Sequence, residues 1–260
     1  ISGNLLKHKF VGIKLLKKFK NLNIIFEKYP KSVSDNYSKK KSNLLINHFR
    51  KVHLYEKKFF EKFCKKNNQF LKNKNLLNIK KGKINKKKYL LKIKKINPNL
   101  IVLNATSLLN KKFIYAFRNK IINIHAGLIP YYRGSGCNVW TFYNKELKYT
   151  GVSIHFVNEK IDDGKIILQS QSSFAKNDNT HSIGCKNAKL SVKLTIDVIK
   201  YLKKNPSYMG KKIITTKSAI FYKKDFKDKI ILKIDELLKK GLVKNYYSKP
   251  KKVKVIKLTK

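Results

Sequence analysis

Cysteine is scarce in this 260-residue chain, and Cys64, Cys137 and Cys185 lie far apart without forming a CxxC pair. This spacing argues against a disulfide framework or a zinc site and favours a reducing compartment. Long apolar runs are also lacking, so no segment predicts a membrane-spanning helix. No signal peptide is recognisable, so we expect a cytoplasmic protein, although a chain that begins at Ile1 leaves open whether the native start is present.

Arginine is nearly absent, although the formal net charge is +48. It occurs only at positions 50, 118 and 133, and the lysines spread along the whole chain instead of forming one block. A phosphate-reading surface generally uses arginine as well, because its planar group pairs with two oxygens at once. The lysine excess, together with abundant Asn and Ile, is typical of an AT-rich genome. It predicts non-specific attraction to polyanions at low salt, and we do not interpret it as a dedicated nucleic-acid interface.

Short apolar runs alternate with helical patterns over residues 1–170. Strands are expected at 1–4, 23–27, 76–79, 100–104, 121–125, 151–157 and 165–171, and helices at 8–20, in the second half of 29–66, and at 86–95, 111–118 and 181–202. This alternation predicts the α/β class, with a mostly parallel central sheet flanked by helices. Beyond residue 206, strand-like pieces at 213–216 and 219–222 and a helix near 228–240 indicate an accessory extension.

Polar side chains stand on or after two of the expected strands. Asn123 and His125 belong to the run 121–125, and Asp162 lies in the loop after the run 151–157. Glycines and a proline between the runs force an irregular loop, and strand ends that feed such loops are where α/β folds place their chemistry. The segment is therefore typical of an enzyme.

An amide, an imidazole and a carboxylate suit acyl transfer to an amine. The amide and a protonated imidazole can stabilise an oxyanion, while the carboxylate orients the imidazole and relays protons. No Ser or Cys has a nucleophile-elbow motif, so direct transfer without an acyl-enzyme is favoured. A metal site made of the same three residues is a weaker alternative, because it offers only one good soft ligand.

Three ordered pieces of the sequence resemble the folate-dependent formyltransferases. N-I-H-x-G-L-x-P-x-Y-R-G spans Asn123 to Gly134, GVSIHFVNEKIDDG spans residues 151–164, and LIVLNATSLL precedes them at residues 100–109. Agreement of three pieces in the right order is far more specific than any one motif. The resemblance implies a Rossmann-like formyltransferase fold, with a catalytic domain over residues 1–205 and a C-terminal extension or small subdomain over residues 206–260.

The resemblance also implies an enzyme that moves a formyl group from 10-formyltetrahydrofolate, without a metal. Asn123, His125 and Asp162 match the family's catalytic triad, and His155 matches a supporting histidine. The folate is expected to contact the turn after residues 100–104 and the loop before Asp162, which together comprise Leu108, Leu109, Val157, Asn158, Glu159 and Ile161. Arg133 and Gly134 are expected to anchor the motif loop or an anionic substrate.

Family members formylate glycinamide ribonucleotide, initiator methionyl-tRNA or amino sugars on nucleotide carriers, and a related branch hydrolyses the donor. The sequence YRGSGCNVW at residues 132–140 departs from the RWRGAAPIQ-like loop of the tRNA enzymes. The first ten residues, ISGNLLKHKF, lack the Gly-Ser-Asn phosphate loop of the glycinamide enzyme. We therefore expect a small-molecule amine, such as an amino-sugar nucleotide, as the acceptor. The alternatives are tRNA, glycinamide ribonucleotide, donor hydrolysis, and a folate- or RNA-binding relative without activity.

Overall fold

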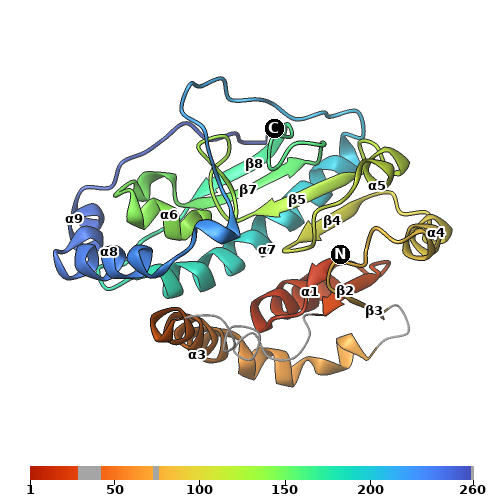
Figure 1. The fold of residues 1–260 in the computed structure, drawn as a ribbon. Coiled ribbons are helices and arrows are strands. Elements are labelled where there is room, and N and C mark those ends of the chain that lie inside the picture. The colour runs from red at the N-terminus through yellow and green to blue at the C-terminus, as the bar shows by residue number, and fades with distance from the viewer. Residues whose placement is uncertain (29–41, 73–75, 259–260) are drawn as a thin grey trace.

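A seven-stranded sheet forms the centre of the computed structural model, which describes residues 1–28, 42–72 and 76–258 (Figure 1). The strand order is β3-β2-β1-β4-β5-β7-β8. The strands are β1 (Ser2–Gly3), β2 (Ile24–Lys28), β3 (Leu76–Lys80), β4 (Ile101–Asn104), β5 (Ile121–His125), β7 (Gly151–Phe156) and β8 (Ile166–Gln171). Neighbouring strands from β3 to β5 are parallel, whereas β7 runs antiparallel to both β5 and β8. The predicted α/β class with a mostly parallel sheet is confirmed.

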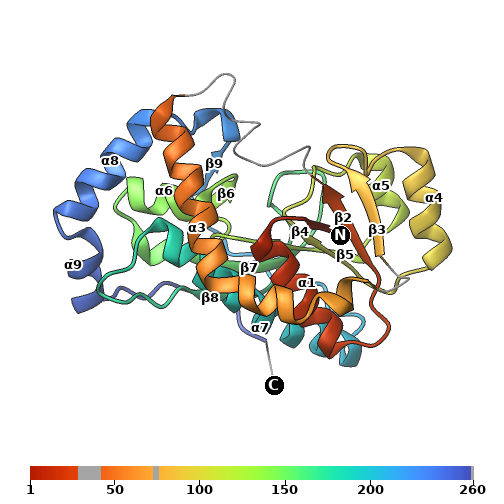
Figure 2. The same ribbon diagram turned by 90° about the horizontal axis from the view of Figure 1, so that it is seen from below.

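Helices cover both faces of this sheet. The first face carries α1 (Leu6–Lys18), α3 (Asn43–Lys66) and α7 (Thr180–Lys204), which Figure 2 shows together. The other face carries α4 (Lys87–Ile96) and α5 (Lys111–Ala116). Three short 3-10 helices lie in the connections: η1 (Asn68–Leu71), η2 (Leu147–Tyr149) and η3 (Lys223–Asp225). A buried apolar cluster lies under each layer, because each helix turns one apolar stripe toward the sheet.

The βαβ unit that leads to the motif strands has the expected form. The side chain of Asn110 caps α5 by accepting from the backbone N–H of Phe113, and α5 returns the chain to β5, parallel to β4. The register pairs Ile101 with Ile121. Parallel strands joined by one helix in this way end at the same edge of the sheet, so residues 105–110, which follow β4, lie at the edge where β5 ends with His125.

The C-terminal segment packs back against the motif loop. Strand β6 (Tyr132–Gly134) pairs in parallel with β9 (Ala219–Phe221), and the helices α6 (Cys137–Tyr143), α8 (Asp228–Lys239) and α9 (Leu242–Ser248) gather beside them. Farther on, the backbone N–H of Gln169 donates to the carbonyl of Ile256 at 2.9 Å. The division of the chain between residues 205 and 206 stays a prediction.

One expected strand is wrong, and three elements were not predicted. Residues 213–216 form no strand, because Ile214 is fully exposed and has no apolar face to pack against. The sequence reasoning missed β6, α6 and α9, which are short and have no repeating apolar pattern. The first part of the predicted polar segment 29–66 lies outside the described residues.

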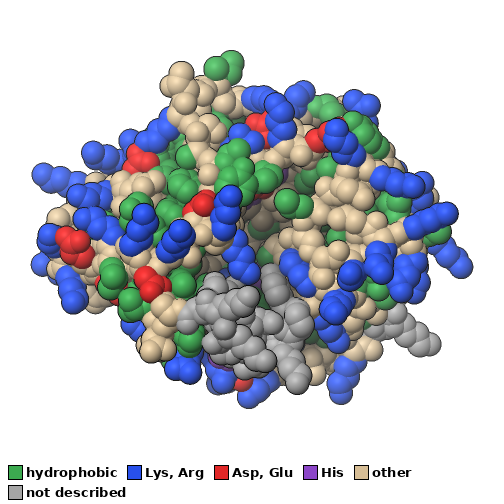
Figure 3. All heavy atoms as spheres, in the orientation of Figure 1, with side chains coloured by type: hydrophobic (Ala, Val, Ile, Leu, Met, Phe, Trp, Pro, Cys, Tyr) green, Lys and Arg blue, Asp and Glu red, His purple; other side chains and the backbone are tan. Residues whose placement is uncertain are grey.

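The surface is dominated by lysine. Lysine and arginine side chains are scattered over the face shown in Figure 3 instead of gathering in one patch. Among the described residues, no helix is both long and apolar enough to cross a bilayer. Cys64, Cys137 and Cys185 are free and buried.

Candidate active site

Strands β5 and β7 bring the polar motif residues onto one face of the sheet. Side chains two positions apart on a strand point the same way, so Asn123 and His125 share a face. The antiparallel register sets Asn123 opposite His155 and His125 opposite Ser153. The sheet therefore supplies an amide and two imidazoles side by side, without any contribution from a flexible loop.

Asp162 joins this group from the loop after β7. Its backbone adopts the left-handed conformation with φ of 44°, which aspartate tolerates better than most residues. Two residues later, a Cβ on Gly164 would lie 1.6 Å from the carbonyl oxygen of Phe156. The D-x-G motif thus has a physical reason, because only glycine lets the loop turn back so tightly against β7.

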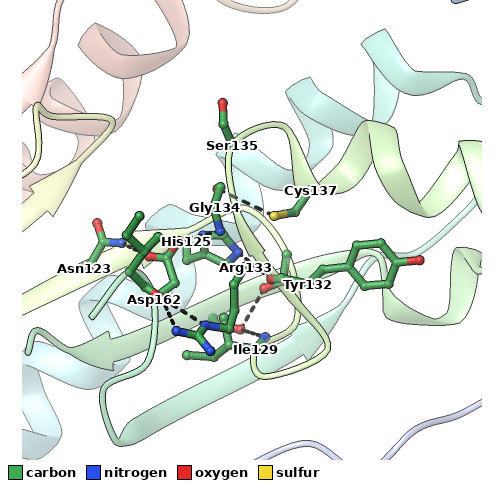
Figure 4. A network of polar contacts seen from close by, with 12 residues as sticks. Asn123, His125, Ile129, Tyr132, Arg133, Gly134, Ser135, Cys137 and Asp162 are labelled. Atoms are coloured by element: carbon green, nitrogen blue, oxygen red, sulfur yellow. Dashed lines mark hydrogen bonds and ion pairs between the residues drawn. The ribbon is translucent and has the colours of Figure 1, made fainter. Parts of the chain in front are cut away.

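The Asp162 carboxylate lies at the centre of the polar network (Figure 4). Its Oδ2 is 3.2 Å from His125 Nδ1 and accepts a hydrogen bond from the backbone N–H of Gly134 at 2.9 Å. Its Oδ1 accepts from Asn123 Nδ2 at 3.1 Å and lies 3.3 Å from His155 Nε2. The structure therefore brings the three predicted catalytic residues into direct contact.

Burial and charge act in opposite directions on this network. Burial raises the pKa of Asp162, but the imidazoles of His125 and His155 and the N–H of Gly134 together bring it well below its usual range. Burial lowers the pKa of His125, and the opposing effect of Asp162 does not restore it. The resting site therefore holds an ionised aspartate beside a histidine that favours its neutral form.

Hydrogen-bond partners indicate where the protons are. His125 Nε2 is 2.9 Å from the carbonyl oxygen of Tyr132, which can only accept, so this nitrogen carries the proton. The lone pair of His125 Nδ1 then faces Asp162. His155 Nδ1 lies 2.8 Å from the carbonyl oxygen of Phe156, and its Nε2 lies 3.2 Å from Asn123 Nδ2 and 3.3 Å from Asp162 Oδ1.

Arg133 and Gly134 hold the loop that carries Asp162. The guanidinium of Arg133 donates from Nε and Nη2 to the carbonyl oxygen of Ile161, at 2.9 and 2.7 Å, and its Nη1 lies 3.4 Å from Asp163 Oδ1. Gly134 contributes the N–H that Asp162 accepts. A Cβ on Gly134 would lie 2.1 Å from the carbonyl oxygen of Phe221, so β9 can approach only a glycine here.

The six residues expected to contact folate lie in two loops, one between β4 and α5 and one after β7. Leu109 and Val157 pack against the same apolar cluster, whereas 71% of the Leu108 surface is exposed. Glu159 pairs with Lys111 at 2.8 Å and accepts from the Tyr115 hydroxyl. The side chain of Asn158 contacts Asp163 and the backbone of Lys160, and the carbonyl of Ile161 is the one that Arg133 binds. No bound ligand tests their assignment, which stays a prediction.

Two contributions to the site had no signal in the sequence. Phe221 lies 87 positions from Gly134, and no spacing rule predicts that β9 pairs with β6. The carbonyl of Tyr132 contributes through its backbone, which side-chain identity does not reveal. Cys137, beside the motif, is an unactivated thiol, because burial raises its pKa well above the ordinary value. Within the described ranges, no group of three or more His, Cys, Asp or Glu side chains is arranged to hold a metal ion.

Comparisons with known proteins show which family this chain resembles. The family model described as formyl transferase matches residues 52–199, more than half of the chain. A methionyl-tRNA formyltransferase of Thermodesulfovibrio yellowstonii is 32% identical over 117 residues, which cover 45% of this chain and 38% of that protein. One from Desulforamulus reducens is 39% identical over 84 residues, which cover 32% of this chain and 26% of that protein. The matched part thus spans well under half the length of these curated relatives.

Solved structures show the same fold at low sequence identity. An N-formyltransferase from Helicobacter canadensis, crystallised with folinic acid and dTDP-3-aminofucose, has a TM-score of 0.55 and 17% identity, over 90% of this chain and 77% of that one. A phosphoribosylglycinamide formyltransferase from Anaplasma phagocytophilum has a TM-score of 0.55 and 15% identity, over 85% of this chain and 98% of that one. The family-model match, which includes the strands and the loop that form the Asn123–His125–Asp162 site, identifies this chain as a member of the formyl transferase family.

Proposed function

We propose that this protein transfers a formyl group from 10-formyltetrahydrofolate to a primary amine, with Asn123, His125 and Asp162 as the catalytic residues. The observation that carries the proposal is the direct contact of these three side chains around one ionised carboxylate. The same arrangement offers a proton acceptor and two groups able to stabilise an oxyanion, which is what formyl transfer to an amine requires.

His125 accepts the proton of the acceptor amine, and Asp162 stabilises the imidazolium that results. As the amine nitrogen bonds to the formyl carbon, it becomes positively charged, and His125 Nδ1 takes up its proton. The lone-pair contact with Asp162 Oδ2 at 3.2 Å then becomes a charge-assisted hydrogen bond. The same proton passes to the folate nitrogen as its bond to the formyl carbon breaks, so His125 and Asp162 return to their starting state.

Asn123 stabilises the oxygen that becomes negative during this attack. Both N–H groups of its amide are engaged in the resting site, one by Asp162 and the other by His155. Donation to an oxyanion therefore requires Asn123 to release one of these contacts. A hydrogen bond to a carboxylate is stronger than one to a ring nitrogen, so we infer that the contact with His155 is released first.

The acceptor that we propose is an amino-sugar nucleotide. Glu56 of α3 argues against a phosphate monoester held at the start of α1, as glycinamide ribonucleotide would require. Its buried carboxylate accepts from the backbone N–H of Lys7 at 3.4 Å and lies 3.2 Å from Lys7 Nζ. An anion is thus already present at this helix N-terminus, where a second one would be repelled.

Methionyl-tRNA is the second candidate acceptor. The curated relatives that match are named methionyl-tRNA formyltransferases, and the scattered lysines would attract any polyanion. Binding of a polyanion such as tRNA to scattered lysines weakens steeply as the salt concentration rises, whereas binding of a small amino-sugar nucleotide depends far less on salt. Activity measured at two salt concentrations therefore distinguishes the two acceptors.

The experiment measures tetrahydrofolate release from 10-formyltetrahydrofolate with amino-sugar nucleotides, methionyl-tRNA and glycinamide ribonucleotide as separate acceptors. We expect release that depends on one acceptor and that falls by roughly 10³-fold in His125→Ala. Asp235→Asn, an exposed change on α8, is the control. Release without an acceptor would indicate hydrolysis of the donor. Acceptor-dependent release that survives in His125→Ala would overturn the catalytic assignment.

A further inference from the structure

We infer that Glu27 is a positioning residue for the formyl-donor pocket, where its carboxylate fixes the loop of residues 105–110. Glu27 lies near the end of β2, on a strand that contributes nothing to the catalytic network. The inference rests on the proposed function, because Leu108 and Leu109 of this loop are among the residues expected to contact the donor.

The Glu27 carboxylate is fully buried and yet well supplied with donors. Its Oε2 accepts from the backbone N–H of Ser107 at 2.5 Å, and its Oε1 accepts from the backbone N–H of Gly82 at 3.2 Å. Lys81 Nζ lies 3.4 Å from Oε2. A buried carboxylate is costly unless hydrogen bonds and a counter-charge compensate for its lost hydration. Glu27 has both the hydrogen-bond donors and the counter-charge that a buried carboxylate requires.

Glu27 lies between two loops that bond to each other. Gly82 N–H donates to Ser107 Oγ at 2.9 Å, and Lys81 Nζ donates to the carbonyl of Ala105 at 3.2 Å. Asn85 completes the connection, because its Nδ2 donates to the carbonyl of Leu108 at 2.8 Å and its Oδ1 accepts from the N–H of Asn110 at 3.0 Å. The backbone of residues 105–110 is thus held from the β3–α4 connection and from the core at once.

The first half of the loop needs this support because its backbone is strained and the side chain of Leu108 packs little against the protein. Ala105 adopts the left-handed conformation with φ of 55°, which is strained for a residue with a Cβ, and Leu108 is 71% exposed. An apolar side chain that is exposed on a fixed backbone is suited to contact a flat ring. Glu27 therefore acts on the donor through Ser107 and the backbone, without touching it.

The isosteric change Glu27→Gln tests this role. An amide has one oxygen where the carboxylate has two, so its NH₂ would face either Gly82 N–H or Ser107 N–H as donor against donor. The loop must then move to relieve that contact. Glu61→Gln is the matched control, because Glu61 lies on α3 and pairs with Lys65 at the surface.

Two measurements are made well below the unfolding temperature: the dissociation constant for folinic acid, a stable formyl-folate, and amide hydrogen exchange at Ser107 and Gly82. In Glu27→Gln we expect the dissociation constant to rise about tenfold and the two amides to exchange faster, with β5 amides unchanged. We expect neither change in Glu61→Gln. If Glu27→Gln does not fold, Asn85→Ala loosens the same loop from outside the core and should raise the dissociation constant in the same direction.

The outcomes separate this inference from the proposed function. If the unmodified protein does not bind folinic acid, the proposed function and this inference both fail. If it binds and Glu27→Gln binds equally well, the role of Glu27 is overturned alone. Faster exchange at Ser107 without any loss of affinity would overturn it as well, because the loop would then not shape the donor pocket.

Discussion

Side chains of opposite charge hold two loops of the candidate site in place, the first between β4 and α5 and the second after β7. Residues 105–110 are held by the carboxylate of Glu27, which accepts from a backbone N–H, whereas residues 157–163 are held by the guanidinium of Arg133, which donates to a backbone carbonyl. Each anchor matches the backbone group that its loop presents. A backbone N–H that a loop turns toward the protein interior needs an acceptor there, and a C=O that it turns inward needs a donor.

The loops also differ in the charge that they carry. Residues 105–110 have no ionisable side chain, but residues 157–163 include Glu159, Asp162 and Asp163. The cation of Arg133 offsets this negative charge, since its Nη1 lies 3.4 Å from Asp163. The first loop therefore offers the donor an uncharged surface. The second loop carries the carboxylate of Asp162, and Arg133 partly neutralises the charge around it.

The largest effect in this comparison is expected from Arg133→Lys. An ammonium cannot donate two bonds to the carbonyl of Ile161 as the guanidinium does, so Asp162 loses part of the support for its left-handed backbone. We expect kcat to fall about 30-fold, with a smaller change in the KM for the donor. Steady-state kinetics measure both. Arg118→Lys, at an exposed position, is the control, and an unchanged kcat in Arg133→Lys would show that Gly134 alone is sufficient to hold the loop.

The second prediction concerns the stability of the fold at acid pH, without a substitution in either loop. Burial lowers the pKa of His48 and of His181 from 6.5 to about 4, and their rings lie 4.8 Å apart between α3 and α7. The unfolded chain therefore binds more protons than the folded one between about pH 6.5 and pH 4, so the free energy of unfolding falls as pH falls through this range. From pH 6.5 to pH 5 we expect a loss of about 2 kcal/mol for each histidine.

Urea unfolding at the two pH values measures this loss. His48→Phe should reduce the pH dependence without removing it, because the pKa values of His8, His125 and His181 are lowered as well. His53→Phe, at an exposed position, is the control. Equal pH dependence in His48→Phe and in the unmodified protein would mean that other groups cause the acid sensitivity. In the expected case, the free energy of unfolding is lower at pH 5 while Arg133 keeps its charge. The experiment therefore measures the packing of α3 against α7 separately from the anchoring of the second loop.

The sequence predicted most of what the second loop does and little of what holds the first. Asn123, His125 and Asp162 lie in two motif blocks whose spacing indicates one site, and the apolar runs around them predicted β5 and β7. Glu27 and Ser107 are 80 positions apart, and a lone glutamate at the end of a strand is chemically ambiguous. Only the parallel packing of β2 beside β1, and of β1 beside β4, brings them together.

Short elements escaped prediction for a related reason. β6 has three residues, too few for an apolar alternation, and it forms because Gly134 admits the backbone of Phe221 in β9. The long helix α7, by contrast, was predicted within a few residues, because its apolar stripe repeats over many turns and Asn179 caps its first turn. Periodicity encodes local structure well, while contacts between distant backbone groups leave little trace in the sequence.

The smallest effect should come from Leu108→Ala in the first loop. Because 71% of the Leu108 surface is exposed, its truncation opens no cavity, and the unfolding temperature should change by less than about 1 °C. If the side chain contacts the donor, the dissociation constant for folinic acid should rise about threefold to tenfold through lost apolar contact. Leu232→Ala on α8, where the leucine is 55% exposed, should change neither quantity. An unaltered affinity in Leu108→Ala, beside a weakened one in Glu27→Gln, would mean that the first loop binds the donor through its backbone groups.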